Sequence, residues 1–368
     1  MEHDLYWYWL CNLSGVGRKT IRRLIDAFYT PEDVFLAEER EVIPFLRGTK
    51  VVNAFVASRK KELIKKQYDR MQCAGVTFLH PDSEQYPTRL KNIPDPPFGL
   101  YLKGRMPDEE KKAIAIIGAR NCTRYGEEMA RFFGRELANC GISVISGLAR
   151  GIDGMAHVGA LESNGYTLGI LGCGIDQVYP QENYNLFMKM QQTGGILSES
   201  NIGIKPSAGL FPERNRLIAG CSDGVLVIEA TDKSGTFITV DQALDQGKDI
   251  FALPGRITDK ESAGCNRLIK MGAHMVMDVE DILEIFDLCG KTKRKCGISE
   301  EIQDKIDHLS LAPFEKMVYS CLRIEPRYLE EIISEVRVAP QEVCMALNKL
   351  LVKGVIVETT RNYYAIKL

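Results

Sequence analysis

The stretch Ser146-Gly-Leu-Ala-Arg-Gly-Ile-Asp-Gly-Met-Ala-His157 decides the fold of this chain. An apolar run at residues 142–145 leads into it, and the residues after Gly151 have helical composition, which predicts a strand, a glycine-rich turn and a helix start. A helix N-terminus presents unpaired backbone N–H groups and about half a positive charge, and Arg150 adds a full charge beside it. The turn is therefore a candidate phosphate site, although a single turn of this kind more often only caps its helix.

Short apolar runs of the same kind recur on both sides of this stretch and alternate with segments long enough for crossover helices. The runs cover residues 76–79, 99–102, 113–117, 142–145, 167–171, 195–197, 225–228, 250–253 and 273–277. Most are too short and too continuous for amphipathic helices, so we predict an α/β fold with an extended, Rossmann-like, mainly parallel sheet. In such a sheet the ligand lies outside the carboxyl ends of the strands, where the turns collect.

Composition describes a globular chain with two or three domains. Its 368 residues are 45% hydrophobic and 26% charged, and the formal net charge of −2 excludes a protein that coats nucleic acid by bulk charge. Eleven cysteines without a CxxC pair indicate reduced thiols rather than disulfides or zinc. No apolar run is long enough to span a bilayer, so we expect a cytoplasmic protein. We also expect neither a metal nor a cofactor.

Helical patterns flank the predicted sheet. Residues 1–70 are predicted to form a small helical domain of the helix-hairpin-helix or SAM-like type, whose tight turn at residues 15–17 either donates N–H groups to DNA phosphates or only packs two helices. Residues 71–290 form the Rossmann-like domain, and the charge run that begins at Lys291 marks a linker over residues 291–305.

The C-terminal segment, residues 306–368, has three helical stretches followed by a two-stranded hairpin. This order is typical of a winged helix. Basic and amide side chains occur on its third helix and in its wing, at Asn348, Lys349, Lys353 and Arg361. Glutamates balance these charges, so we favour protein contact or an auxiliary role over groove reading.

The turns after the predicted strands concentrate positive charge that the net charge hides. Gly118 permits a sharp exit from its strand, and Arg120 inside that turn is a better candidate for phosphate than Arg124, for which a surface ion pair is equally expected. Together with the turn at residues 254–256, the turns form one predicted rim. Its cations are Arg120, Arg150, Arg214, Arg216 and Lys233.

The sequence of the turn after residues 167–171 disfavours a dinucleotide site. Gln177 stands where the third glycine of GxGxxG would be, and no acidic residue ends a following strand in the ribose-binding position. Asn183 and Tyr184 instead suit a base or sugar, the first by hydrogen bonds and the second by stacking, although a tyrosine at a helix start is more often packed.

Six ordered motifs carry a family resemblance. They are Ile-Ile-Gly-Ala-Arg at 116–120 with Tyr125-Gly126, Ser-Gly-Leu-Ala-Arg-Gly-Ile-Asp at 146–153 with Ala156-His157, Leu-Gly-Cys-Gly-Ile-Asp at 171–176 with Tyr179-Pro180 and Asn183, Phe-Pro-Glu-Arg-Asn-Arg at 211–216, Glu229 with Ser-Gly-Thr at 234–236, and Leu-Pro-Gly at 253–255. In this order and spacing the chain resembles the DprA or Smf family of DNA processing proteins, strongly over residues 70–280. A basic residue often follows Tyr-Pro in that family, whereas here it is Gln181, which puts its backbone contact in doubt.

The resemblance implies a single-stranded DNA binder without known catalysis, acting in natural transformation and homologous recombination. It further implies a homodimer that protects incoming DNA and helps to load the RecA recombinase. We expect the cations of the rim to bind successive phosphates of one strand while Tyr184, with Phe211 or Phe237 as a further candidate, contacts bases. The predicted DNA-binding residues are Gly118, Arg120, Ser146, Gly147, Arg150, Asn183, Tyr184, Arg214, Asn215, Arg216, Lys233, Ser234 and Thr236.

An enzyme of the same Rossmann-like superfamily is the alternative. Those enzymes cleave nucleoside monophosphates with a Gly-Gly-x-Gly-Thr-x-x-Glu turn, and here Thr239 stands three residues after Thr236 in place of the glutamate. Asp153 and His157 lie four apart and could form an acid-base pair, but a cap and a core histidine are the more common outcome. We therefore expect no catalytic residues, and a small-nucleotide sensor stays open as a third interpretation.

Overall fold

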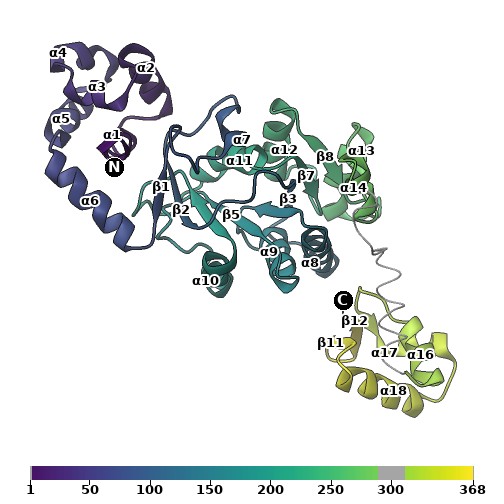
Figure 1. Cartoon of the computed structure of the whole chain (residues 1–368). Helices are drawn as coiled ribbons and strands as arrows, with labels where there is room; N and C mark the ends of the chain where they lie inside the picture. Colours follow the sequence, from purple (N-terminus) through teal and green to yellow (C-terminus); the bar gives the residue numbers. More distant parts are fainter. Residues whose placement is uncertain (1, 289–310, 368) are drawn as a thin grey trace.

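A computed structural model describes residues 2–288 and 311–367, and the predicted linker at 291–305 lies outside the described residues. Figure 1 shows N-terminal helices at one end of a central sheet and a small C-terminal unit at the other end. No helix within the described residues combines the length and apolarity needed to cross a membrane.

A nine-stranded sheet forms the centre, in the order β1-β2-β6-β5-β4-β3-β7-β8-β9. The strands are β1 Thr77–Leu79, β2 Leu100–Gly104, β3 Ala113–Ile117, β4 Ser143–Ser146, β5 Thr167–Leu171, β6 Gly195–Ser198, β7 Gly224–Val227, β8 Asp249–Ala252 and β9 His274–Met275. Strands β3 to β9 are parallel, and β1 and β2 join the sheet in antiparallel pairs. Each of the predicted apolar runs is a strand, so the α/β fold with an extended, mainly parallel sheet is confirmed.

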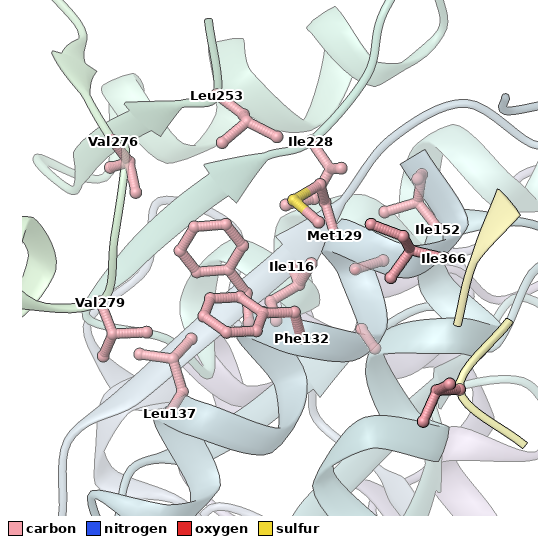
Figure 2. Close-up of a cluster of buried hydrophobic side chains, with 14 of the residues drawn as sticks. Ile116, Met129, Phe132, Leu137, Ile152, Ile228, Leu253, Val276, Val279 and Ile366 are labelled. Carbon is pink, nitrogen blue, oxygen red and sulfur yellow. The ribbon is translucent and has the colours of Figure 1, made fainter. Parts of the chain in front are cut away.

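Helices cover both faces of this sheet because its central strands are apolar on both sides. The side chains of Ile114 and Ile116 on β3 join the cluster of α8 and α9, whereas those of Ala115 and Ile117 join the cluster of α11 and α12. Figure 2 shows the first cluster, where Ile116 lies among side chains of α8 such as Phe132. The helices of the central unit are α7 Thr88–Lys91, α8 Arg124–Asn139, α9 Ile152–Glu162, α10 Tyr184–Thr193, α11 Leu210–Gly220, α12 Thr236–Asp245, α13 Ala263–Lys270 and α14 Glu280–Ile285.

The strand order changes direction at β3. Strands β4, β5 and β6 follow on one side of it, and β7, β8 and β9 follow on the other. The loops that leave β3 and β7 therefore diverge to opposite faces of the sheet, which opens a crevice at the carboxyl ends of these two strands. This switch point is where an open α/β sheet binds its ligand.

The N-terminal helices pack around α1, Glu2–Cys11, whose residues from Leu5 to Leu10 are all buried. The next helix, α2 Arg18–Phe28, follows a turn in which Gly15 has a φ of +79°, a conformation open mainly to glycine. The remaining helices are α3 Pro31–Leu36, α4 Glu39–Val42, α5 Thr49–Ser58 and α6 Lys61–Cys73. The predicted helix, tight turn and helix are thus present, and the domain boundaries stay predictions.

The C-terminal unit follows the predicted order of three helices and a hairpin, with one short strand that the sequence did not indicate. Its elements are α16 Pro313–Ser320, β10 Arg327–Tyr328, α17 Leu329–Val336, α18 Pro340–Val352, β11 Ile356–Thr360 and β12 Tyr363–Ile366, with the sheet order β10-β12-β11. Lys353, expected on the third helix, is the residue directly after α18 and lies 2.6 Å from Glu315, which neutralises part of the positive charge there. The unit meets the central domain through Ile366 in the buried cluster and through an Arg256–Glu325 ion pair of 2.9 Å. Its assignment as a winged helix stays a prediction.

Candidate nucleic-acid interface

A cavity of about 530 Å³ opens at the switch point, at the carboxyl ends of β3 and β7. Its walls come from the turn after β3, the turn after β4, the start of α11 with the loop before it, and the start of α12. A second hollow of about 160 Å³ adjoins it and shares Arg120, Tyr179 and Phe211 with it. Together they form one crevice, which contains eight predicted site residues: Gly118, Arg120, Gly147, Arg150, Arg214, Asn215, Ser234 and Thr236.

Three turns that are far apart in sequence are locked together beneath this crevice. The N–H of Ala119 donates to the carbonyl oxygen of Glu229 over 2.9 Å, and the N–H of Ile152 donates to the carbonyl oxygen of Ala119 over 3.3 Å. Gly151, at a φ of +70°, lies so close that a Cβ there would sit 2.5 Å from the Ala119 oxygen. The glycine of the second turn therefore allows the first turn to approach, and this contact places Arg120 at the crevice.

Arg120 lies over one ring of an aromatic pair at the crevice. Its guanidinium carbon lies 5.0 Å from the centroid of the Phe211 ring, and the Tyr179 ring lies 5.7 Å from Phe211 at an interplanar angle of 32°. Arg120 is exposed and forms no ion pair within the described part of the chain. Its charge is therefore held in place by the ring and remains available to an anion.

Arg150 lines the smaller hollow and lies 2.6 Å from Glu182, with both side chains 60% exposed. An exposed pair of this kind contributes little free energy, so a phosphate can replace the glutamate. Lys233 is exposed in the turn before α12. Lys233 lines neither hollow, but it stands next to Ser234, which lines the larger one.

Hydroxyl groups line the crevice at the start of α12. The Ser234 hydroxyl donates to Thr236 Oγ1 over 2.8 Å and accepts the N–H of Thr236 over 3.2 Å. A Cβ on the intervening Gly235 would meet no atom within 4 Å, so this turn faces open space. The arrangement places small polar groups and a helix N-terminus where an anionic ligand can reach them.

Arg214 forms the floor of the crevice and is buried. Its Nη1 donates to the carbonyl oxygens of Gly147, over 2.9 Å, and of Ile170. Burial lowers the pKa of Arg214 to about 10, while the nearby Asp153 carboxylate opposes this shift, so the guanidinium stays charged at neutral pH. Burial also raises the pKa of Asp153, against the effect of Arg214. Arg214 thus fixes the turn after β4 and adds positive potential from below.

Three further predicted residues lie outside the crevice. Ser146 is buried and donates its hydroxyl to the carbonyl oxygen of Ile116 over 2.6 Å, which joins β4 to β3. The Asn183 amide donates to the carbonyl oxygens of Leu148 and Ala149, so it braces the turn after β4. Tyr184 is 50% exposed at the first position of α10, outside both hollows.

Arg216 corrects the predicted rim. It is buried, its Nη2 lies 2.8 Å from Glu199 Oε1, and its Nε donates to the carbonyl oxygen of Asp95 over 2.9 Å. Alternate residues of a helix point in different directions, so Arg214 and Arg216 cannot both face one ligand. Arg120 and Arg150 line the crevice, with Arg214 beneath them, whereas Arg216 and Lys233 line neither hollow.

The N-terminal glycine turn packs against the central domain. Arg18, directly after it, lies 2.8 Å from Asp95 and 3.3 Å from Glu199. A hollow of about 280 Å³ at this junction is lined by Gly17, Arg18 and the carboxylates of Glu199 and Glu213. Carboxylates repel phosphate, so the geometry favours the packing interpretation of this turn over DNA contact.

Asp153 and His157 have separate partners. Asp153 accepts the N–H of Gly147 over 3.1 Å, and His157 donates from Nδ1 to Thr167 Oγ1 over 2.6 Å. No hydrogen bond links the two side chains within the described residues. Burial lowers the pKa of His157 to about 3, with Arg214 adding to the shift. His157 is a core histidine, as expected, whereas Asp153 holds the turn after β4 and does not cap α9, whose N-cap is Gly151.

The sequence did not predict the structural roles of Glu229 and Tyr179. The buried Glu229 carboxylate accepts the N–H of Thr123 over 2.8 Å and its hydroxyl over 2.5 Å, so it fixes the start of α8. Tyr179 supplies the second ring of the aromatic pair. Both residues stand in the family motifs, and this is the one sequence signal that could have drawn attention to them. No local pattern shows that Tyr179 contacts Phe211.

The fold and this crevice define a class: an open Rossmann-like α/β protein whose switch point presents cations, hydroxyls and aromatic rings to a phosphorylated ligand. A family model described as DNA recombination-mediator protein A matches residues 77–287. Protein Smf of Synechocystis is 32% identical, over 96% of this chain and 96% of its own length. The chain belongs to the DNA recombination-mediator protein A family, also called DprA or Smf, which confirms the resemblance.

Two solved structures extend this comparison. The X-ray structure of DNA processing protein A from Streptococcus pneumoniae aligns with a TM-score of 0.65 and 29% identity, and covers 77% of this chain and 97% of its own. A structure of DNA processing protein A from Helicobacter pylori aligns with a TM-score of 0.51 and 32% identity, over 57% of this chain and 95% of its own, and was described for its single-stranded DNA binding mode.

Proposed function

We propose that this protein binds single-stranded DNA in the switch-point crevice. The observation that carries the proposal is the placement of Arg120 over the Phe211 ring, which in turn contacts the Tyr179 ring. The guanidinium can bind a phosphate, and the neighbouring rings can stack on a base. Only an unpaired strand exposes the faces of its bases. Helicobacter pylori DNA processing protein A, which shares the fold, is described as binding single-stranded DNA.

In this proposal phosphates lie beside Arg120, Arg150 and Lys233, and a base contacts the aromatic pair rather than Tyr184. The Ser234 and Thr236 hydroxyls and the α12 N-terminus receive a further phosphate oxygen. Few cations are involved and the net charge is −2, so each subunit binds with modest affinity. Binding by more than one subunit then raises the total affinity.

The proposal also covers a homodimer, a recombinase partner and the absence of catalysis. Exposed Met275 on the edge strand β9 and the nearby Met277 support a homodimer. Membership of the family supports delivery of the strand to a RecA recombinase during transformation or recombination in the cytoplasm. We propose no catalysis, because Thr239 lines the cavity where the related hydrolases have glutamate.

The test is a titration of fluorescent single-stranded and double-stranded oligonucleotides at several salt concentrations. Wild-type protein should prefer the single strand. Arg120→Ala should flatten the log-log salt slope by about 0.7 and weaken binding about fivefold at roughly 0.1 M salt, independently of base sequence.

Lys65→Ala is the matched control, because Lys65 is an exposed residue of α6 and its loss changes the net charge by the same amount. This variant should bind as the wild type does. Equal binding by the Arg120 and Lys65 variants would remove the crevice from the DNA site. Release of free base from nucleoside monophosphates would instead support the hydrolase alternative.

A further inference from the structure

A cluster of metal-ligating side chains lies at the junction of the N-terminal helices and the sheet, far in sequence from the crevice residues. One donor atom each of His3, His80 and Asp82 lies within 4.8 Å of the other two. His3 is on α1, and the other two residues follow β1. Residues 77 positions apart along the chain are therefore brought together at this point.

His80 is arranged as a metal ligand. It is only 2% exposed, and its Nε2 lies 3.0 Å from Asp4 Oδ1. A carboxylate can only accept, so this contact keeps the proton on Nε2 and leaves a lone pair on Nδ1. That Nδ1 is buried and has no hydrogen-bond partner. Carboxylate contacts of this kind orient and tautomerise the histidines of metal sites.

The other donors are held by a neighbouring indole. Asp82 Oδ2 lies 2.9 Å from His3 Nε2 and accepts the indole N–H of Trp7 over 2.7 Å. The Trp7 ring also stacks on the His80 ring, with centroids 5.6 Å apart and an angle of 16°. The group is thus packed on one side and partly exposed on the other, where His3 and Asp82 remain accessible.

Donor chemistry selects the class of ion. Two imidazoles and a carboxylate suit Zn²⁺, whose ligands lie at about 2.0–2.2 Å, whereas Ca²⁺ and Mg²⁺ prefer oxygen alone. Ligands around a tetrahedral ion stand about 3.3–3.5 Å apart, so the donor atoms, which lie within 4.8 Å of one another, must approach slightly when the ion binds.

We propose that His3, His80 and Asp82 bind a Zn²⁺ ion, with Asp4 positioning His80. The ion joins α1 to the loop after β1 and so fastens the N-terminal helices to the edge of the sheet. The fourth position is filled by water or by a second carboxylate. Nothing in this proposal depends on DNA binding, since the cluster contains no residue of the crevice.

The test uses the full chain after treatment with a chelator. Calorimetric titration with Zn²⁺ should show one site, and saturation should raise the Tm by several degrees, because a ligand of the folded state stabilises it. Titration with Co²⁺ should give the visible absorption of a tetrahedral nitrogen and oxygen site without thiolate charge-transfer bands. Ni²⁺ should quench the fluorescence of Trp7, which contacts the ligands.

His3→Ala and Asp82→Asn should each weaken Zn²⁺ binding at least tenfold and abolish the Tm shift. His274→Ala is the matched control, because it removes a histidine from β9 that also lies near a carboxylate, 3.7 Å from Asp249, and it should leave Zn²⁺ binding unchanged. Retention of the site in both variants, or thiolate bands in the Co²⁺ spectrum, would assign the metal to cysteines and overturn the proposal.

Discussion

His157 offers the sharpest test of the buried site, because its burial predicts a pH dependence of stability. Its side chain is fully buried and its pKa in the folded protein is about 3, against 6.5 for a free imidazole. Below pH 6.5 the unfolded chain binds a proton that the native state does not, so the free energy of unfolding falls as the pH falls from 6.5 toward 3. Between about pH 7 and about pH 5 the loss should be about 2 kcal/mol from this residue.

The perturbation is His157→Gln, which removes the titrating group and keeps a donor for Thr167 Oγ1. Urea unfolding of wild type and variant at both pH values isolates the contribution of His157 to the free energy of unfolding, because all other titrating groups are common to both proteins. Wild type should lose about 2 kcal/mol more than the variant on acidification. As a second measurement, NMR should show that the His157 imidazole does not titrate between about pH 5 and pH 8. A His157 that titrates near pH 6.5, or equal losses in both proteins, would contradict the buried, neutral imidazole and reopen the acid-base interpretation.

Two further predictions address the crevice and its support. Phe211→Ala should weaken single-stranded DNA binding by about 1–3 kcal/mol in a fluorescence titration, with little change in the salt slope. Phe211→Leu should recover only part of the lost affinity. Full affinity in the alanine variant would exclude stacking of a base on this ring. Gly126→Ala should lower the free energy of unfolding by about 1–3 kcal/mol in urea titrations, because the new Cβ would lie 2.4 Å from the buried Glu229 Oε2. An unchanged midpoint would show that Glu229 is free to move.

The sheet and its turns followed from local pattern. Each run such as residues 113–117 is apolar throughout because both faces of a central parallel strand are covered by helices, and this composition is visible without any tertiary information. The rule that ligands bind at carboxyl ends of strands then identified Arg120, Arg150 and the residues before α12 as neighbours. The short strand β10 was not predicted, because two residues are too few to show the alternation of apolar and polar side chains that marks a strand.

Side-chain direction and long-range partners depended on the folded chain. Arg214 and Arg216 look equivalent in sequence and both are buried, yet their positions on α11 place Arg214 beneath the crevice and Arg216 against Glu199. Likewise the spacing of His3, His80 and Asp82 contains no metal motif, and only the packing of α1 on the end of β1 joins them. Periodicity specifies which backbone forms and which face is apolar, whereas the partner of a charged side chain is set by segments that the chain brings together only on folding.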